Sequence, residues 1–238
     1  MMGKSFSMGV RDGIPICLGY LSVSFAFGIF SVGCGLSILE TVMVSMLNVT
    51  SAGQLAGVPI IASLGSYVEL MLSQLIINLR YALMSVSLSQ KLDRDIRLGD
   101  RLAIAFVNTD EVFAVASGKE GQVTRSYMYG LILTPFLGWT VGTALGAVAG
   151  NILPAILVSA LGIAIYGMFI AIVIPESRKK KSTALLALFS VALSCLFYYL
   201  PALKKIPSGF VIIICASLAS ALFAILFPIL GEEVDENA

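Results

Sequence analysis

Long stretches without any charged side chain are the feature that most constrains how this chain can fold. A helix needs roughly 20 residues to cross the hydrocarbon core of a bilayer. A charge at the bilayer centre costs about 2.5–3.5 kcal/mol on insertion scales, so charges mark where membrane segments end. Five stretches in the chain are long enough and free of charge, namely residues 13–39, 41–68, 126–175, 182–203 and 206–231.

The composition excludes a soluble fold. Hydrophobic residues make up 58% of the chain and charged residues 12%, with a mean hydropathy of +0.96. Soluble domains contain about 45–50% and about 25% of these classes. The net charge of +1 indicates no nucleic acid or other polyanionic partner. We therefore expect an integral membrane protein that contacts the lipid bilayer over most of its surface.

The residues that are missing narrow the chemistry. The chain has no histidine, which excludes serine–histidine catalysis and the usual histidine-containing zinc and haem sites. Its four cysteines stand singly in apolar runs, so we expect small packing residues rather than a metal or redox motif. An intramembrane aspartyl protease needs two aspartates at membrane depth, and only Asp110 qualifies. The sequence predicts no enzyme, no cofactor and no metal site.

The spacing of charges and turn residues predicts the membrane segments. Residues 126–175 are long enough for two helices, with a turn at Gly150-Asn151. Residues 36–90 are expected to form two or more helices, at least one of them broken, and residues 103–117 a short tilted helix or a re-entrant segment. The predicted fold class is an all-α polytopic transmembrane helix bundle with about seven or eight membrane segments, including broken or short helices. Single spans are expected over residues 13–33, 182–199 and 206–230.

The domain organisation follows from the same pattern. We expect a single integral membrane domain over residues 1–238, with a charged loop at 91–101 and an acidic tail at 231–238. A glycine-rich span followed by a span rich in small residues occurs twice, which leaves open two weakly related halves at about 8–90 and 125–205. Duplicated halves are common in secondary transporters.

The distribution of basic residues predicts an orientation. Lys4, Arg11 and the basic cluster at residues 178–181 are expected to face the cytoplasm. The first span has no signal-peptide cleavage site, so it is expected to be retained. These features predict a multi-pass protein of the cell (cytoplasmic) membrane with a cytoplasmic N-terminus.

A row of glycines marks one helix face. Because four residues make about one helical turn, glycines spaced by four fall on the same face, where another backbone can approach closely. We expect a tight helix–helix seam there, and the alternative is a seam that slides or rocks during transport. The row consists of Gly138, Gly142, Gly146 and Gly150.

A polar, glycine-bearing segment interrupts the second apolar stretch at residues 51–59 and is interpreted as a break in a helix. Open helix ends offer N–H groups to an anion and carbonyl groups to a cation, and an amino acid carries both charges. Ser51, Gly53 and Gln54 are therefore predicted to bind substrate. The alternative is a structural kink in which Gln54 forms a hydrogen bond across helices.

The run Asn78-Leu79-Arg80-Tyr81 places an arginine in an apolar segment. Arg80 either extends to the membrane interface or points inward, where it would pair with Asp110 or Glu111. It could also hold a substrate carboxylate through two hydrogen bonds. Asn78 and Arg80 are predicted to bind substrate.

Asp110 and Glu111 lie in the middle of an apolar segment, after Asn108 and Thr109. Without histidine, a proton relay at membrane depth would have to use Asp or Glu. We predict that Asp110 and Glu111 form the ion-coupling site, with Asp110 facing inward and Glu111 as second choice. The alternative is an exposed turn at the interface. Pairing with Arg80 lowers and desolvation raises a carboxyl pKa, so the sequence leaves the sign of the shift open.

Several motifs between residues 8 and 176 are characteristic in their order and spacing. They are Gly13-Ile14-Pro15, Phe27-Gly28, Gly35-Leu36-Ser37, Ser51-Ala52-Gly53-Gln54, Asn78-Leu79-Arg80-Tyr81, Thr109-Asp110-Glu111-Val112-Phe113 and Met168-Phe169-Ile170-Ala171. Together they resemble the AzlC-type permeases, the large subunits of branched-chain amino acid exporters. The resemblance implies efflux of branched-chain amino acids with a small AzlD-like membrane subunit. One departure is Tyr81, where the family often has histidine.

The residues alone predict a polytopic transporter-like protein, and the resemblance adds the substrate. We expect a secondary transporter that exports leucine, isoleucine, valine or a similar amino acid. Export against a gradient needs an energy source, and because no nucleotide-binding glycine-rich loop is present we expect an ion gradient. The alternatives are a membrane channel and a non-transporting membrane subunit of a larger complex.

Overall fold

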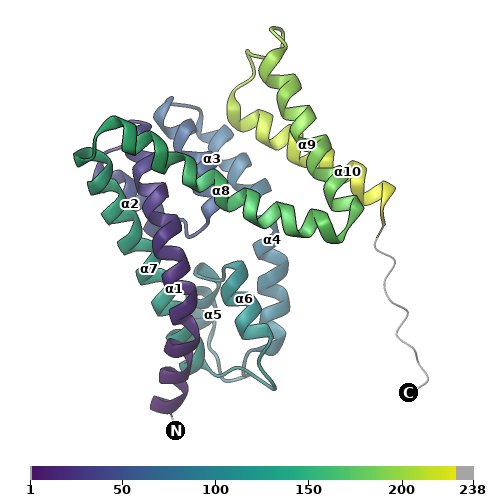
Figure 1. The fold of residues 1–238 in the computed structure, drawn as a ribbon. Coiled ribbons are helices and arrows are strands. Elements are labelled where there is room, and N and C mark those ends of the chain that lie inside the picture. The colour runs from purple at the N-terminus through teal and green to yellow at the C-terminus, as the bar shows by residue number, and fades with distance from the viewer. Residues whose placement is uncertain (1, 229–238) are drawn as a thin grey trace. The chain divides into compact units, whose positions relative to one another are not determined.

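The computed structural model describes residues 2–228, which fold into helices and short connections without a β-sheet. The chain divides into two compact units, residues 1–168 and 169–238, with the boundary inside α8. The described residues form ten helices (Figure 1). These are α1 (Met2–Gly33), α2 (Ile38–Leu47), α3 (Ser51–Ala62), α4 (Tyr67–Lys91), α5 (Leu98–Phe106), α6 (Asp110–Ser117), α7 (Arg125–Ile152), α8 (Ala155–Lys179), α9 (Lys181–Tyr199) and α10 (Ser208–Leu226).

Five of these helices, α1, α4, α7, α9 and α10, are long and apolar enough to cross a membrane, and α2 and α3 are apolar but shorter. Large apolar side chains remain exposed along them, as at Leu75, Leu79 and Leu83 on one face of α4. In a bilayer such a face contacts lipid rather than water. The predicted all-α polytopic bundle with short helices is confirmed.

The first helix begins earlier than the sequence predicts. It starts at Met2 instead of residue 13, so that Arg11 and Asp12 lie inside it. The Asp12 carboxylate accepts a hydrogen bond from the Tyr127 hydroxyl at 2.8 Å and pairs with the Lys119 ammonium at 2.7 Å. Because Tyr127 and Lys119 compensate the charge of Asp12, the helix continues through this position.

The charged connection between α4 and α5 is shorter than expected. Because α4 ends at Lys91 and α5 begins at Leu98, residues 92–97 alone connect the two helices. In α5, Asp100 accepts a hydrogen bond from the Tyr129 hydroxyl at 2.8 Å and pairs with Arg125 at 2.9 Å, and these contacts hold its pKa below the usual range. The predicted acidic tail at 231–238 and the end of the last predicted span lie outside the described residues.

Two breaks in the helical chain lie at positions that the sequence did not predict. Residues 51–59 are helical, and the break lies just before them, between Asn48 and Thr50. Thr50 caps α3, since its hydroxyl accepts a hydrogen bond from the Gly53 N–H at 3.4 Å. The predicted segment 103–117 is likewise two helices, α5 and α6, and Thr109 caps the second.

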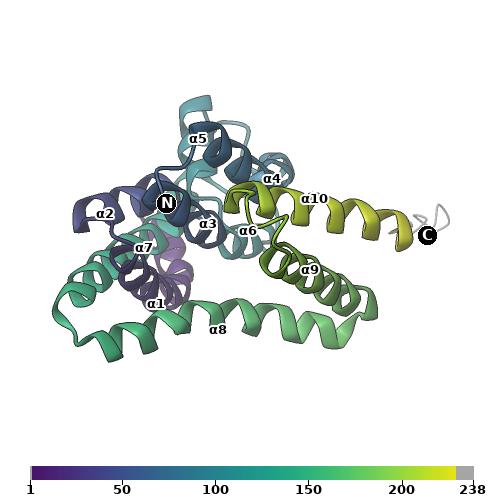
Figure 2. The same ribbon diagram turned by 90° about the horizontal axis from the view of Figure 1, so that it is seen from above.

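Helices α1 and α7 lie side by side along most of their length (Figures 1 and 2). A Cβ atom at Gly146 would lie 2.0 Å from the Phe25 carbonyl oxygen, and one at Gly28 would lie 2.3 Å from the Thr143 carbonyl oxygen. Only glycine permits such a backbone approach. The whole predicted row, Gly138, Gly142, Gly146 and Gly150, faces α1 in this way.

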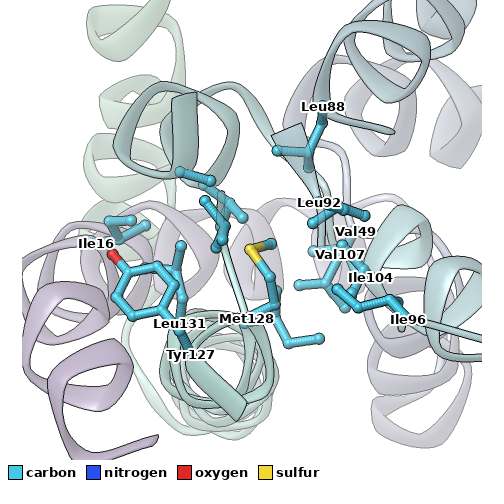
Figure 3. Packing of buried hydrophobic residues seen from close by; sticks show 14 of the residues in the cluster. Ile16, Val49, Leu88, Leu92, Ile96, Ile104, Val107, Tyr127, Met128 and Leu131 are labelled. Carbon is cyan, nitrogen blue, oxygen red and sulfur yellow. The ribbon is translucent and has the colours of Figure 1, made fainter. Parts of the chain in front are cut away.

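The apolar core of the first unit lies where α4, α5, α6 and α7 meet the middle of α1 (Figure 3). Met128 and Leu131 of α7 are fully buried there, beside Ile104 of α5. Two buried pairs of hydroxyl groups join α2 to the neighbouring long helices. Ser45 of α2 lies 2.6 Å from Thr143 of α7, and Thr41 of α2 lies 2.9 Å from Ser31 of α1.

The second unit contains the hairpin of α9 and α10. Phe189 of α9 packs against Phe223 of α10 with ring centroids 5.9 Å apart. The Ser194 hydroxyl of α9 donates to the buried Cys215 Sγ of α10 at 3.8 Å. All four cysteines of the chain are free. Cys215 is buried, Cys17 and Cys34 are half-buried and Cys195 is exposed, so the buried packing position that the sequence suggests is found at Cys215.

Candidate functional site

Helix α4 carries a polar stripe that faces α3 and, at Ser85, the connection between α5 and α6. The stripe follows helical spacing, because residues three and four apart lie on one face. Its members are Ser73, Gln74, Asn78, Tyr81 and Ser85, which are buried or half-buried, whereas the opposite face is apolar and exposed. A long apolar helix that turns its polar side chains inward provides a surface for binding a polar solute.

The break between α2 and α3 is held by this stripe. The Asn78 amide and the Asn48 amide both donate to Gln74 Oε1 at 3.2 Å, and Gln74 Nε2 donates to the Gly53 carbonyl oxygen at 2.9 Å. The Thr50 hydroxyl donates to Asn78 Oδ1 at 3.0 Å. The side chains on both sides of the break are therefore joined to α4 in one hydrogen-bonded network.

Gln54 connects this network to α7. Its side chain is fully buried, and its Oε1 accepts a hydrogen bond from the indole Nε1–H of Trp139 at 2.9 Å. The Thr50 backbone N–H lies 3.4 Å from the same oxygen. The Gln54 Nε2 atom is buried and has no partner within residues 2–228.

Arg80 forms an ion pair with Asp110. The distance from Arg80 Nη1 to Asp110 Oδ2 is 2.8 Å, and both side chains are about half exposed. Arg80 lies near the middle of the 25-residue α4, roughly 16–20 Å from either end. The pairing with Asp110 corresponds to the inward-pointing alternative for Arg80. Tyr81 joins the pair to the α3 cap, accepting from Arg80 at 3.4 Å and donating to Thr50 at 3.3 Å.

Glu111 has a different partner from Asp110. It accepts a hydrogen bond from the Tyr20 hydroxyl of α1, and the Tyr20 ring packs edge-on against Trp139 with centroids 5.1 Å apart. Adjacent residues on a helix point about 100° apart. The two carboxylates at the start of α6 are consequently held by α4 and by α1, and both lie where the helix dipole favours negative charge.

A cavity of about 370 Å³ lies between α2, α3 and α4. Asn48, Gln54 and Gln74 supply its polar wall, and Gly57 leaves room beside them. The remaining wall is apolar apart from Glu40, which is tied to the Ser37 backbone and hydroxyl in the capping box of α2. The apolar wall consists of Leu36, Met43, Val44, Leu47, Ile61 and Leu70. Ligand sites of small molecules have this combination of volume, apolar wall and few polar groups.

Most of the residues predicted from the sequence meet in this region. Gly53, Gln54 and Asn78 belong to the network at the break, and Arg80 and Asp110 form the adjoining pair. Glu111 lies beside them through Tyr20. Ser51 begins α3 and is half-buried, but the capping role falls to Thr50.

The sequence did not reveal the roles of Tyr20, Thr50, Gln74 and Trp139. The spacing of Gln74, four residues before Asn78, could have indicated a shared face. Trp139 is the single tryptophan of the chain and stands next to Gly138, but no pattern predicts that its N–H reaches Gln54. Among the described residues, no group of three or more Cys, Asp or Glu side chains is arranged to hold a metal ion.

The fold and the site define a polytopic helical membrane protein with a polar network at a helix break. The chain belongs to the AzlC family, since it matches the family described as "AzlC protein" over residues 15–153. It is 29% identical over 198 residues to "Inner membrane protein YgaZ" of Escherichia coli (strain K12), covering 80% of each chain. It is 30% identical over 191 residues to an "Uncharacterized membrane protein" of Archaeoglobus fulgidus, covering 79% of this chain and 84% of that protein. No solved structure matches the chain.

Proposed function

We propose that this protein is a secondary transporter that exports branched-chain amino acids across the cytoplasmic membrane. The observation that carries the proposal is the cavity of about 370 Å³, which has an apolar wall from α2, α3 and α4 and a polar end at Asn48, Gln54 and Gln74. An aliphatic side chain suits the apolar wall, and the backbone charges of an amino acid suit the polar end.

The helix break at residues 48–50 supports the recognition of a zwitterion. The C-terminal end of α2 carries a partial negative charge and the N-terminal end of α3 a partial positive charge. Both ends adjoin the cavity, since Leu47, Asn48 and Gln54 are part of its wall. In transporters, interrupted helices bind the charged groups of a substrate in this manner. Ser51, Gly53, Asn78 and Arg80 belong to the proposed substrate site or support it.

An ion gradient is the proposed energy source. Asp110 and Glu111 are carboxylates joined to the site through Arg80 and Tyr20, so a change in their protonation would alter contacts to α4 and α1. We propose Asp110 as the primary coupling residue and Glu111 as the second. The basic residues Lys4 and Arg11 and the cluster at 178–181 favour a cytoplasmic N-terminus.

A small AzlD-like membrane subunit is the proposed partner, and the ground for it is family membership together with the resemblance noted above. A membrane channel is the second candidate, which the polar network would also permit. A non-transporting subunit is the third, but it gives no reason for a polar network and an ion pair midway along a membrane helix.

Flux of labelled leucine, isoleucine and valine in vesicles tests the proposal. With the chain and its small subunit present, we expect saturable export that a pH or Na⁺ gradient accelerates at least tenfold. The chain alone should give far lower flux. Flux that rises linearly with concentration and ignores the gradient would indicate a channel, and the absence of flux for all three amino acids would contradict the proposed function.

A further inference from the structure

We propose that Trp139 is a positioning residue that fixes the Gln54 amide so that its Nε2 donates hydrogen bonds to the carboxylate of the substrate. The inference rests on the proposed function. It adds that the substrate carboxylate is the group recognised and that Trp139 orients the side chain that binds it. It assigns a role to a side chain of α7 that is not part of the cavity wall.

The orientation of the Gln54 amide is determined by its neighbours. The two N–H groups around Oε1 are the Trp139 indole at 2.9 Å and the Thr50 backbone at 3.4 Å. Both groups are donors only, because neither an indole nor a backbone nitrogen can accept. Turning the Gln54 amide by 180° would place its NH₂ group, itself a donor, against these two N–H donors. Oε1 therefore stays beside the Trp139 N–H, and Nε2 points away from the N–H groups of Trp139 and Thr50.

The Nε2 group is left without an acceptor. Gln54 is fully buried, and its Nε2 has no hydrogen-bond partner within the described part of the chain. The large majority of buried polar side-chain atoms in native proteins have a partner. Because the neighbouring acceptor Gln74 Oε1 is already used by Asn48 and Asn78, the missing acceptor must come from outside this network.

The cavity beside Gln54 identifies the chemical class of that acceptor. Gln54 contributes to the wall of the 370 Å³ space, and most of the remaining wall is apolar. A carboxylate offers acceptors and no donor, which complements an NH₂ group with two free protons. A small carboxylate with an aliphatic side chain satisfies both the amide and the apolar wall.

Trp139 is itself held in place. Its side chain is buried, and the Tyr20 ring packs against it edge-on with centroids 5.1 Å apart. The indole therefore cannot follow a moving amide, and its N–H gives Gln54 one preferred orientation. Loss of this donor would leave the amide free to rotate, which should weaken binding of a carboxylate without removing any atom from the cavity.

Competition by leucinol measures this recognition. Leucinol has the side chain and ammonium of leucine but an alcohol in place of the carboxylate. In vesicles we expect the parent protein to prefer leucine over leucinol by about a hundredfold, since the neutral alcohol offers one acceptor oxygen in place of the two charged oxygens of the carboxylate. Trp139→Phe keeps an aromatic ring and removes the N–H. The variant should raise the KM for leucine about tenfold at unchanged kcat. It should also reduce the preference for leucine over leucinol about tenfold.

Two further variants make the test decisive. Gln54→Leu removes the donor itself and should abolish the preference for leucine over leucinol. Thr143→Val is the control, because it removes another buried side-chain hydrogen bond of α7, to Ser45, and should leave the preference unchanged. If Trp139→Phe inserts poorly, leucine and leucinol binding to Gln54→Leu in detergent gives the same comparison. Leucine transport with an unchanged preference in both Trp139→Phe and Gln54→Leu would overturn the inference, whereas no leucine transport by the parent would overturn the proposed function.

Discussion

Replacing Arg80 with leucine is expected to reduce amino acid transport at least a hundredfold while the protein still reaches the membrane. The Arg80 guanidinium pairs with Asp110 at 2.8 Å and contacts the Tyr81 hydroxyl at 3.4 Å. Removing it leaves Asp110, at the start of α6, without its counter-charge, and Tyr81 loses one of its two hydrogen bonds. An ionised carboxylate without a partner is unfavourable at membrane depth. Initial transport rates, normalised to inserted protein, measure the effect.

Two variants separate the charge of Arg80 from its shape. Arg80→Lys retains the charge but loses the planar fork that can contact Asp110 and Tyr81 together, so transport should fall to an intermediate level. The double variant Arg80→Leu with Asp110→Leu removes both charges and should insert as well as the parent but still fail to transport. Normal flux in Arg80→Leu would contradict the account and would make the pair a structural feature only.

The second large effect is expected at Asp110. We expect Asp110→Asn to lose uphill export, by at least tenfold, while exchange of substrate under equal gradients continues. Exchange requires only that the loaded site reorients, whereas uphill export requires an ion to bind and leave in each cycle. The amide keeps a hydrogen-bonding group beside Arg80 but cannot ionise. Uphill export driven by a pH step and exchange in the same vesicles give the two quantities.

Glu111→Gln is the matched variant. The Tyr20 hydroxyl can still donate to a glutamine oxygen, so its contact to α1 persists. We expect a smaller loss of uphill export than at Asp110, because Glu111 lacks the direct pairing with α4. If both variants export uphill as well as the parent between pH 6 and pH 8, then neither carboxylate is the coupling site.

The sequence best predicts the features that depend only on residues close together along the chain. Charge-free lengths predict α7 to α10, and a turn is predicted at Gly150-Asn151 with Pro154. The structure places that turn slightly later, at residues 153–154, because Gly150 and Asn151 still belong to the last turn of α7. Helical spacing likewise predicts that Gly138 and Gly146 share a face, which the structure places against α1. These features depend on hydrophobicity and period, which a single sequence contains.

The position of the first helix break required information from another helix. The glycines after Ser51 suggested a break, but a Cβ atom at Gly53 would lie 2.5 Å from Gln74 Oε1, so this glycine permits close packing inside α3. The break itself is set by Thr50, a favourable capping residue three positions earlier. Glycine occurs both where the backbone is flexible and where two segments pack closely, and the sequence alone does not distinguish these cases.

The site was predicted in part for the same reason. Arg80 and Asp110 stand out because a charge in an apolar segment requires a partner, and the predicted pairing is present. Trp139 and Tyr20 do not stand out, because aromatic residues are ordinary in apolar helices. Their roles depend on one N–H and one O–H that reach Gln54 and Glu111 from distant segments.

Protection of a single cysteine by leucine tests most directly whether the cavity between α2, α3 and α4 binds the substrate. The four native cysteines are free and can be replaced by alanine. In this background, Val44→Cys puts a thiol in the cavity wall, and Val42→Cys puts one on the same helix outside it, at a similarly half-buried position. We expect saturating leucine to slow maleimide labelling at position 44 at least fivefold and to leave labelling at position 42 unchanged. Equal labelling rates at position 44 with and without leucine, in a variant that still transports leucine, would contradict the account.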